Sequence, residues 1–269
     1  MLTPVRLVDH HVHTTFSDGL GTPLEIATRA AELGLAGVAA VDHLAIGPYN
    51  DEPGYSIEIA RIGEYIAAVR AADEAHPGVR ALAAIEVDYG PDTVDEAAAL
   101  LAAHDFDFVY GSVHFIDGRV VDTRASLQGS LWVDVDAVYE RYFEVVAEAA
   151  ATGLFDVIAH LDLPKKFGHR PRDTARVEAA LGAALDAIAA AGAAVELNTC
   201  GWRVPAGEAY PSPAILARAA ARGIPLVVGS DAHRVDEVGA DFARALAVAA
   251  EAGYDATLRL TDGELEAIG

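Results

Sequence analysis

The chain has 269 residues and a formal net charge of −22, because 41 acidic residues outnumber 19 lysines and arginines. This charge argues against nucleic acid as a partner, since phosphate backbones are bound by clustered Lys and Arg. Hydrophobic residues make up 52% of the chain, which excludes a disordered protein and favours one large α/β domain over residues 1–269.

Short β-branched runs alternate along the chain with longer alanine-rich stretches of helical periodicity. The predicted strands, in chain order, are Val5–Asp9, Gly37–Asp42, Arg80–Val87, Phe106–Val113, Phe155–His160, Ala193–Asn198 and Ile224–Ser230. The predicted helices are Pro23–Leu33, Ser56–Ala75, Val94–His104, Val135–Ala151, Asp173–Ala191, Pro213–Arg222 and Val235–Ala250. Strands that alternate with helices in this way indicate a parallel sheet with helical crossovers.

Such a sheet is either open and doubly wound or closed into a barrel. No G-x-G-x-x-G follows the first predicted strand, so the dinucleotide-binding fingerprint is absent. The longest irregular segments all follow the carboxyl end of a strand, where barrel enzymes keep their functional loops. These segments are His43–Tyr55, Asp117–Asp134, Asp162–Arg172 and Thr199–Ser212.

The cysteine content and the hydropathy of the chain bear on its location. Cys200 is the only cysteine, so no internal disulfide can form, which favours a reducing compartment. The residues before His11 contain no apolar leader, and no apolar run reaches the roughly 18–20 residues that span a membrane. We therefore expect a cytoplasmic protein with a small-molecule substrate and no membrane partner.

Histidines and carboxylates stand at the carboxyl ends of successive predicted strands. In a parallel barrel these ends meet on one face. His11 and His13 are two residues apart on an extended segment and point the same way, and so do Asp231 and His233. Imidazoles together with carboxylates form the ligand sets of Zn²⁺, Mn²⁺ and Fe²⁺. Nine candidate ligands result: His11, His13, Asp18, His43, Glu86, His114, His160, Asp231 and His233.

Nine candidates are more than one ion needs, so two or three divalent ions are predicted, with Glu86 as the bridging carboxylate. A histidine taken singly is more often a core residue, but chance does not explain a set that recurs at successive strand ends. Lys165, Lys166 and Arg203 follow later strands on the same face, where positive charge suits phosphate or another oxyanion. Trp202 could stack on a flat ring or pack its own loop.

Several short segments resemble the PHP (polymerase and histidinol phosphatase) superfamily. They are Asp9-x-His11-x-His13, Asp42-His43, the strand-ending Glu86, Gly111-Ser112-Val113-His114, Ala159-His160-Leu161-Asp162 and Gly229-Ser230-Asp231-Ala232-His233. The segments Glu196–Arg203, Gly207–Pro213 and Lys165-Lys166-Phe167 resemble its histidinol-phosphatase branch. The resemblance extends from Leu7 to about Gly239.

This resemblance implies a distorted TIM-like (β/α)₇ barrel, in a single domain, with a trinuclear metal site. By position, the first ion is held by His11, His13, Glu86 and Asp231, the second by Glu86, His114 and His160, and the third by Asp18, His43 and His233. The expected catalytic residues are Glu86, Asp231 and His233, and the expected substrate contacts are Lys165, Asn198, Trp202 and Arg203. Cys200 and Trp202 depart from the Ser and Leu that the family more often carries, at the place where substrate specificity is set.

The implied activity is that of a metal-dependent phosphomonoesterase, a hydrolase of L-histidinol phosphate in histidine biosynthesis. Another small phosphate ester, such as a nucleotide, is the alternative within the same chemistry. Two other classes stay open: a metal-dependent hydrolase of amide bonds, against which Lys165 and Arg203 argue, and a metal-binding barrel without enzymatic activity.

Overall fold

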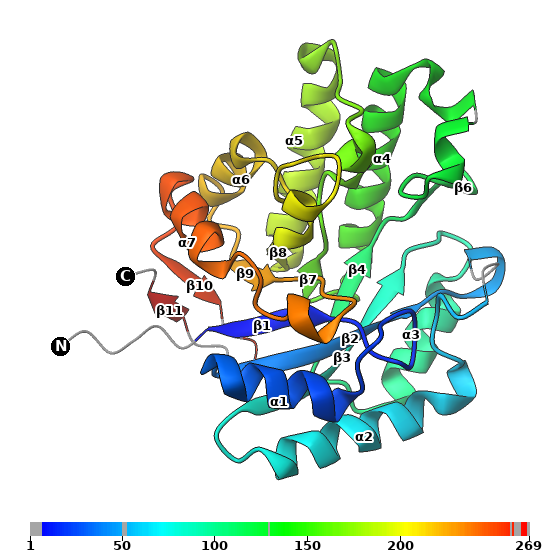
Figure 1. Ribbon diagram of the computed structural model, residues 1–269. Coiled ribbons are helices and arrows are strands. Elements are labelled where there is room, and N and C mark those ends of the chain that lie inside the picture. The colour runs from blue at the N-terminus through cyan, green and yellow to red at the C-terminus, as the bar shows by residue number, and fades with distance from the viewer. Residues whose placement is uncertain (1–6, 50–52, 129, 259, 261–264, 268–269) are drawn as a thin grey trace.

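The structure is a computed structural model that describes residues 7–49, 53–128, 130–258, 260 and 265–267. Seven parallel strands lie side by side in the order β1-β2-β3-β4-β7-β8-β9 (Figure 1). Their bounds are β1 Val8–Val12, β2 Gly37–Leu44, β3 Arg80–Asp88, β4 Phe108–Ser112, β7 Val157–Ile158, β8 Ala194–Asn198 and β9 Leu226–Gly229. The first and last strands also meet, because the amide of His13 donates to the carbonyl of Ala232 at 2.9 Å. The sheet is therefore a nearly closed barrel, which confirms the predicted fold class.

Helices cover the outside of this barrel. Within the described residues they are α1 Pro23–Leu33, α2 Ile62–Ala75, α3 Val94–Ala103, α4 Val135–Ala151, α5 Thr174–Ala191, α6 Pro213–Ala220 and α7 Phe242–Glu251. Figure 1 shows α1 and α2 on one side of the strands, and α4 and α5 packed together on the opposite side. This placement leaves the loops that follow the strands free to form a site at the carboxyl end.

Local sequence signals fix where the helices begin and end. Thr22 and Glu25 form a capping box at the start of α1, in which each side chain accepts a hydrogen bond from the other residue's amide, and Pro23 takes the first helical position. Asp173 caps α5 by accepting from the amide of Arg176 at 3.1 Å. Asp134 caps α4 in the same way, by accepting from the amide of Ala137 at 3.0 Å. The caps explain why the predicted bounds of α1 and α4 match the structure.

The core has an interior layer and an outer layer, set by the alternation of side chains along each strand. In β2, Ala39 and Val41 belong to the cluster inside the barrel, whereas Val38 and Ala40 pack against the helices. Two residues further on, the same alternation turns His43 to the interior at the carboxyl end of the strand. Apolar side chains thus fill the body of the barrel, and polar ones occupy its carboxyl end.

A β-bulge interrupts the pairing of β1 with β2. Around it, two consecutive side chains enter the barrel: the ring of His10 packs against Phe108, and the ring of His11 against Tyr110. Both of these aromatic residues belong to the interior cluster. In a regular strand, consecutive side chains would point to opposite faces. Because of the bulge, His10 and His11 both point into the barrel, and His11 reaches the polar side chains at its carboxyl end.

Most predicted bounds agree with the structure to within one or two residues, and four elements show the largest differences. The first strand is Val8–Val12 rather than Val5–Asp9, of which residues 5 and 6 lie outside the described residues, and the fifth is reduced to the two residues of β7. The helix predicted from Ser56 begins at Ile62, after a short 3₁₀ turn. The last helix begins at Phe242 instead of Val235, because the chain turns at Gly239 with a φ of 69°.

The structure also adds two short antiparallel hairpins that the sequence patterns did not predict. They are β5 Phe115–Ile116 with β6 Arg119–Val120, and β10 Ala256–Leu258 with β11 Leu265–Ala267. Strands of two or three residues are too short to show a period in the sequence. Among the described helices, none is both long and apolar enough to cross a bilayer.

Candidate metal centre

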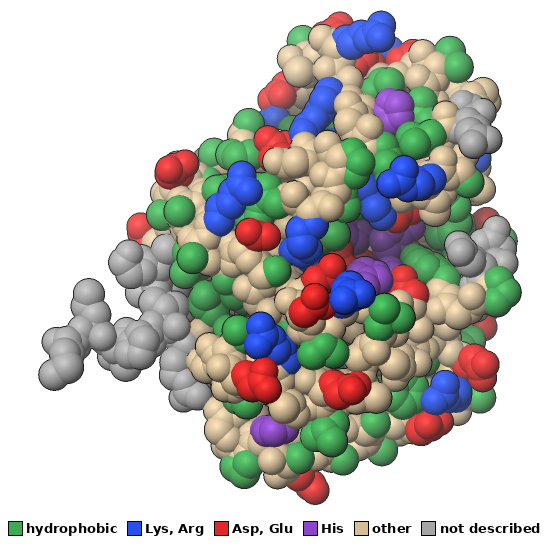
Figure 2. Space-filling view, in the orientation of Figure 1, with side chains coloured by type: hydrophobic (Ala, Val, Ile, Leu, Met, Phe, Trp, Pro, Cys, Tyr) green, Lys and Arg blue, Asp and Glu red, His purple; other side chains and the backbone are tan. Residues whose placement is uncertain are grey.

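The nine candidate ligands come together in a hollow at the carboxyl end of the barrel. Figure 2 shows histidine side chains deep in this hollow, with acidic and basic side chains around its rim. Six of the side chains are buried: His11, His13, His43, Glu86, His114 and His160. The other three, Asp18, Asp231 and His233, are partly exposed and form the outer edge of the cluster.

Glu86, which points inward from β3, lies at the centre of the cluster. Its Oε1 is 3.0 Å from Nε2 of His160 and 3.9 Å from Nε2 of His114. Its Oε2 is 2.9 Å from Nδ1 of His43 and 3.4 Å from Nε2 of His11. The two oxygens of one carboxylate thus face imidazoles from four different segments, which is the position that a bridging ligand would need.

A second group joins the first strand to the loop that follows the last one. Nε2 of His11 is 3.1 Å from Nε2 of His13, which in turn is 3.1 Å from Oδ1 of Asp231. The ligand atoms of these three residues all lie within 4.8 Å of one another. The predicted convergence of His11 and His13 on one side of the chain is therefore present in the structure.

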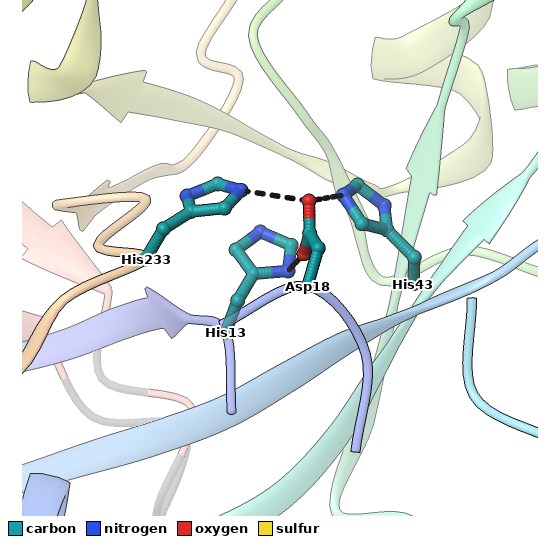
Figure 3. A group of neighbouring side chains, drawn as sticks. All are labelled: His13, Asp18, His43 and His233. Carbon is teal, nitrogen blue, oxygen red and sulfur yellow. Dashed lines mark ion pairs between the residues drawn. The ribbon is translucent and has the colours of Figure 1, made fainter. Parts of the chain in front are cut away.

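A third group surrounds the carboxylate of Asp18, which lies between three imidazoles (Figure 3). Its Oδ2 is 3.3 Å from Nε2 of His233 and 3.8 Å from Nε2 of His43, and its Oδ1 is 3.6 Å from Nδ1 of His13. This carboxylate comes from the loop after β1. The group shares His13 and His43 with its neighbours, so the whole cluster is continuous.

The polar atoms of the cluster are incompletely satisfied by protein alone. Among the described residues, Nδ1 of His13, Nδ1 of His43, Nδ1 of His160 and Oε2 of Glu86 have no aligned hydrogen-bond partner. His43 and Glu86 approach to 2.9 Å without the alignment that an N–H···O bond requires. Buried groups left in this way are costly, and divalent cations would satisfy them. The nitrogen and oxygen donors present therefore fit Zn²⁺, Mn²⁺ or Fe²⁺.

Electrostatics keep Glu86 and His13 in the forms that bind metal, whereas nearby carboxylates outweigh the effect of burial and raise the pKa of His11, His43, His114 and His233. Burial opposes the ionisation of Glu86, but the adjacent His43 and His11 hold the pKa of its carboxyl well below the usual value. Burial, together with the neighbouring His233 and His43, lowers the pKa of His13 to about 3. An ionised carboxylate and a neutral imidazole both have lone pairs available for a cation.

Two buried carboxylates orient the candidate ligands from behind, and the sequence reasoning did not select them. Oε1 of Glu196 is 2.8 Å from Nδ1 of His11, and its Oε2 accepts a hydrogen bond from the amide of His160 at 3.0 Å. Asp88 is hydrogen-bonded to Nδ1 of His114, and Tyr55 donates its hydroxyl to Asp88 at 2.9 Å. Such carboxylates fix the ring orientation of metal-binding histidines. Their only sequence signal is an acidic residue near a strand end.

The two consecutive lysines lie in different surroundings. Lys165, the expected phosphate contact, is fully buried, with Nζ 2.8 Å from Asp162 and 3.0 Å from Glu208. Its charge is therefore compensated inside the fold. Lys166 instead lines the hollow, where its Nζ is 3.0 Å from Oδ2 of Asp122. The exposed positive charge is therefore that of Lys166 and not, as expected from the sequence, that of Lys165.

The other expected substrate contacts hold the loop after β8 in place. Arg203 donates to the carbonyl that precedes Asp231 at 2.6 Å. Trp202 is covered on one face by the guanidinium of Arg244, 4.2 Å from the ring centroid. Asn198 is buried and donates to Oδ2 of Asp231 at 3.0 Å. Asn198 therefore positions a candidate ligand, and the side chain of Arg203 is 23% exposed.

Comparison with known proteins agrees with this barrel fold. A family model described as "PHP domain" matches residues 9–200, and another, described as "PHP-associated", matches residues 215–242. The first match covers most of the chain, so the protein belongs to the PHP family of metal-dependent phosphoesterases. 

Relatives and solved structures narrow the comparison. A Deinococcus radiodurans protein named "Probable histidinol-phosphatase" is 39% identical over 242 residues, which cover 89% of this chain and 91% of the relative. The Bacillus subtilis protein named "Histidinol-phosphatase" is 26% identical, over 86% and 95% of the two chains. A Lactococcus lactis histidinol phosphate phosphatase, solved with zinc, L-histidinol and phosphate, has the same fold, with a TM-score of 0.78, 19% identity and coverage of 97% and 99%. A structure from Listeria monocytogenes gives a TM-score of 0.80 at 21% identity, over 88% and 99%.

Proposed function

We propose that the protein hydrolyses L-histidinol phosphate to L-histidinol and phosphate. The observation that carries the proposal is the buried cluster of imidazoles and carboxylates around Glu86, in a chain 39% identical to a relative named as a histidinol-phosphatase over nearly its whole length. The single cysteine supports a reducing compartment, the cytoplasm, and the net charge of −22 supports a small-molecule substrate over nucleic acid.

The proposed ligand sets follow the three groups of side chains. His11, His13, Glu86 and Asp231 would hold one ion, Glu86, His114 and His160 a second, and Asp18, His43 and His233 a third. When bound, divalent ions supply Lewis-acid activation and a nucleophilic water near neutral pH. Glu86, Asp231 and His233 are the proposed catalytic residues because they would hold the ions that activate the phosphoryl group.

The remaining side chains bind and orient the ester. Lys166 and Arg203 place positive charge at the rim, where they contact the phosphoryl oxygens and stabilise the charge that develops on them. Asn198 keeps Asp231 in place through its hydrogen bond of 3.0 Å. Burial raises the pKa of the Cys200 thiol to about 12, so this residue stays protonated and takes no part as a nucleophile.

The size of the hollow favours a small ester over a nucleotide. The cavity next to the histidines measures about 290 Å³ and is lined by Tyr55, His114, Asp122 and Lys166, among others. Small-molecule sites range from about 300 to 1,000 Å³, so the volume of this one lies just below that range. The lining lysine argues against an amide substrate, because an oxyanion is the group that positive charge beside the metal ligands would recognise.

The test is phosphate release by zinc- or manganese-loaded protein, with L-histidinol phosphate compared with nucleotides and sugar phosphates. We expect a kcat/KM for histidinol phosphate in the ~10⁴–10⁸ M⁻¹s⁻¹ range of dedicated enzymes, far above the other esters. The Glu86→Gln variant is the control, and it should lose metal and activity together. Equal, slow turnover of all esters would remove histidinol phosphate as the substrate, and full metal occupancy with no turnover would favour a metal-binding barrel without activity.

A further inference from the structure

Two loops meet at the hollow where the ester is proposed to bind. The first, which we call the long loop, lies between β6 and α4, and the structure describes its residues 121–128 and 130–133. The second, which we call the lysine loop, is residues 163–169, after β7. Asp122 of the long loop and Lys166 of the lysine loop both line the hollow. The way in which the two loops are joined therefore bears on the position of Lys166.

A ring stack joins the two loops away from the hollow. The indole of Trp132 and the imidazole of His169 have centroids 4.1 Å apart and planes inclined by only 7°. Both residues are half-buried. Nε1 of Trp132 and Nε2 of His169 have no hydrogen-bond partner among the described residues. The contact is therefore one between ring faces, to which no hydrogen bond of these two nitrogens contributes.

Two further contacts join the same loops. The guanidinium of Arg124 lies 5.9 Å from the centroid of the Phe167 ring, and Nζ of Lys166 lies 3.0 Å from Oδ2 of Asp122. Along the lysine loop, the contacts with the long loop thus begin at Lys166, at the hollow, and end at the ring stack of His169. The two loops are joined over their length and not at a single point.

The backbone of the lysine loop is held independently of the ring stack. The carbonyl of Lys166 accepts a hydrogen bond from the amide of Ala206 at 3.0 Å, and that of His169 accepts one from the hydroxyl of Tyr139 at 2.9 Å. What the stack adds is the position of the long loop, which carries Asp122. Because a lysine side chain is long and flexible, the carboxylate of Asp122 decides where its ammonium group points.

We propose that Trp132 and His169 are positioning residues for substrate binding. Their stack holds the long loop against the lysine loop, so that Asp122 keeps the ammonium group of Lys166 directed into the hollow, at the phosphoryl group of the ester. The inference rests on the proposed function, in which Lys166 contacts the phosphoryl oxygens. Neither ring lines the hollow, so their effect on the ester passes through Lys166.

The test is calorimetric titration of inorganic phosphate into the zinc-loaded protein, which requires no turnover. We expect His169→Ala to weaken phosphate binding about three- to tenfold, because a charged contact is weaker when its geometry is not held in advance. His169→Phe keeps a flat ring against Trp132 and should bind phosphate as the parent protein does. Equal weakening in His169→Ala and His169→Phe would overturn the role of the stack.

The matched control is His104→Ala, which should bind phosphate as the parent protein does. His104 is another half-buried histidine beside an aromatic ring, that of Phe106, with centroids 6.1 Å apart, and it does not line the hollow. Weakening of phosphate binding in His104→Ala to the same degree as in His169→Ala would overturn the inference, because the effect would then not be specific to the two loops.

A second background separates positioning from a general loosening of the fold. In the Lys166→Ala protein, His169→Ala should weaken phosphate binding no further, because the stack acts through Lys166. The same loss in both backgrounds would overturn the inference and leave the proposed function in place. Absence of phosphate binding by the parent protein would instead overturn the proposed function, and this inference with it.

Discussion

Lys165 and Lys166 are adjacent in the sequence, and their surroundings predict opposite effects of substitution. Lys166→Ala should raise KM for the phosphate ester several-fold and cost less than about 1 kcal/mol of stability, because Lys166 faces the hollow and its ion pair with Asp122 is partly exposed. Lys165→Ala should cost about 3–5 kcal/mol of stability, because it leaves the buried carboxylate of Asp162 without its cation. Steady-state kinetics and urea unfolding of both variants check this. The reverse pattern would show that Lys165 is the phosphate contact after all.

Glu196 is expected to act on the metal centre through the imidazole of His11. Glu196→Gln keeps the size of the side chain but removes the charge behind His11, so zinc affinity should fall about 10–100-fold. Metal competition with a chromophoric chelator measures this. Glu178→Gln, on the exposed side of α5, is the control and should bind zinc as the parent protein does. An unchanged affinity in Glu196→Gln would contradict the orienting role.

The sequence predicted the meeting of the nine polar side chains because parallel strands bring their carboxyl ends to one face. Their roles as metal ligands stay a prediction. The burial of Lys165 could not be predicted, since its partner Glu208 lies 43 residues further along the chain. The roles of Glu196 and Asp88 could not be predicted either. In a sequence, an acidic residue at a strand end that binds a metal cannot be distinguished from one that orients a metal-binding histidine.

At the scale of elements, two glycines in different surroundings should respond in opposite ways to alanine. A Cβ on Gly182, inside α5, would meet only Nη2 of Arg218 at 3.7 Å, so Gly182→Ala should stabilise the protein by about 0.5–1 kcal/mol. A Cβ on Gly111, in β4, would lie 2.4 Å from the ring of Phe155, so Gly111→Ala should destabilise it by about 1–3 kcal/mol. Urea unfolding of the two variants measures both. Equal effects would contradict the packing of Phe155 against β4.

The helices and long strands were predictable where caps and periodicity agreed, as at Pro23–Leu33 and Val135–Ala151. The register of β1 was not, because a bulge shifts the pairing without altering the hydrophobic pattern that is read from the sequence. The hairpins β5–β6 and β10–β11 were missed since two or three residues give no period. Local signals therefore determined the elements, and tertiary contacts determined their ends.

For the whole molecule, metal removal should lower the unfolding temperature. The proposed ligands come from almost every strand, so bound ions stabilise only the folded barrel. One ion at a hundred times its dissociation constant contributes about 2.7 kcal/mol, and a chain of this size gains about 2–4 °C per kcal/mol. Dialysis against a chelator should therefore lower the melting temperature by about 5–10 °C or more, and zinc should restore it. An identical melting curve before and after chelation would contradict a metal centre of this kind.

The seam between β1 and β9 bears on the order of events during synthesis. His13 and Asp231, which approach to 3.1 Å, are separated by 218 residues. At about 5–20 residues per second, a ribosome needs about 10–40 s to extend the chain from the first of these residues to the second. During that interval the nascent chain contains His13 without Asp231, and the edge of β1 that pairs with β9 has no partner. The ions proposed to bind Asp231 and His233 can therefore be retained only after the last strand has emerged from the ribosome, whereas the set of Glu86, His114 and His160 is complete earlier.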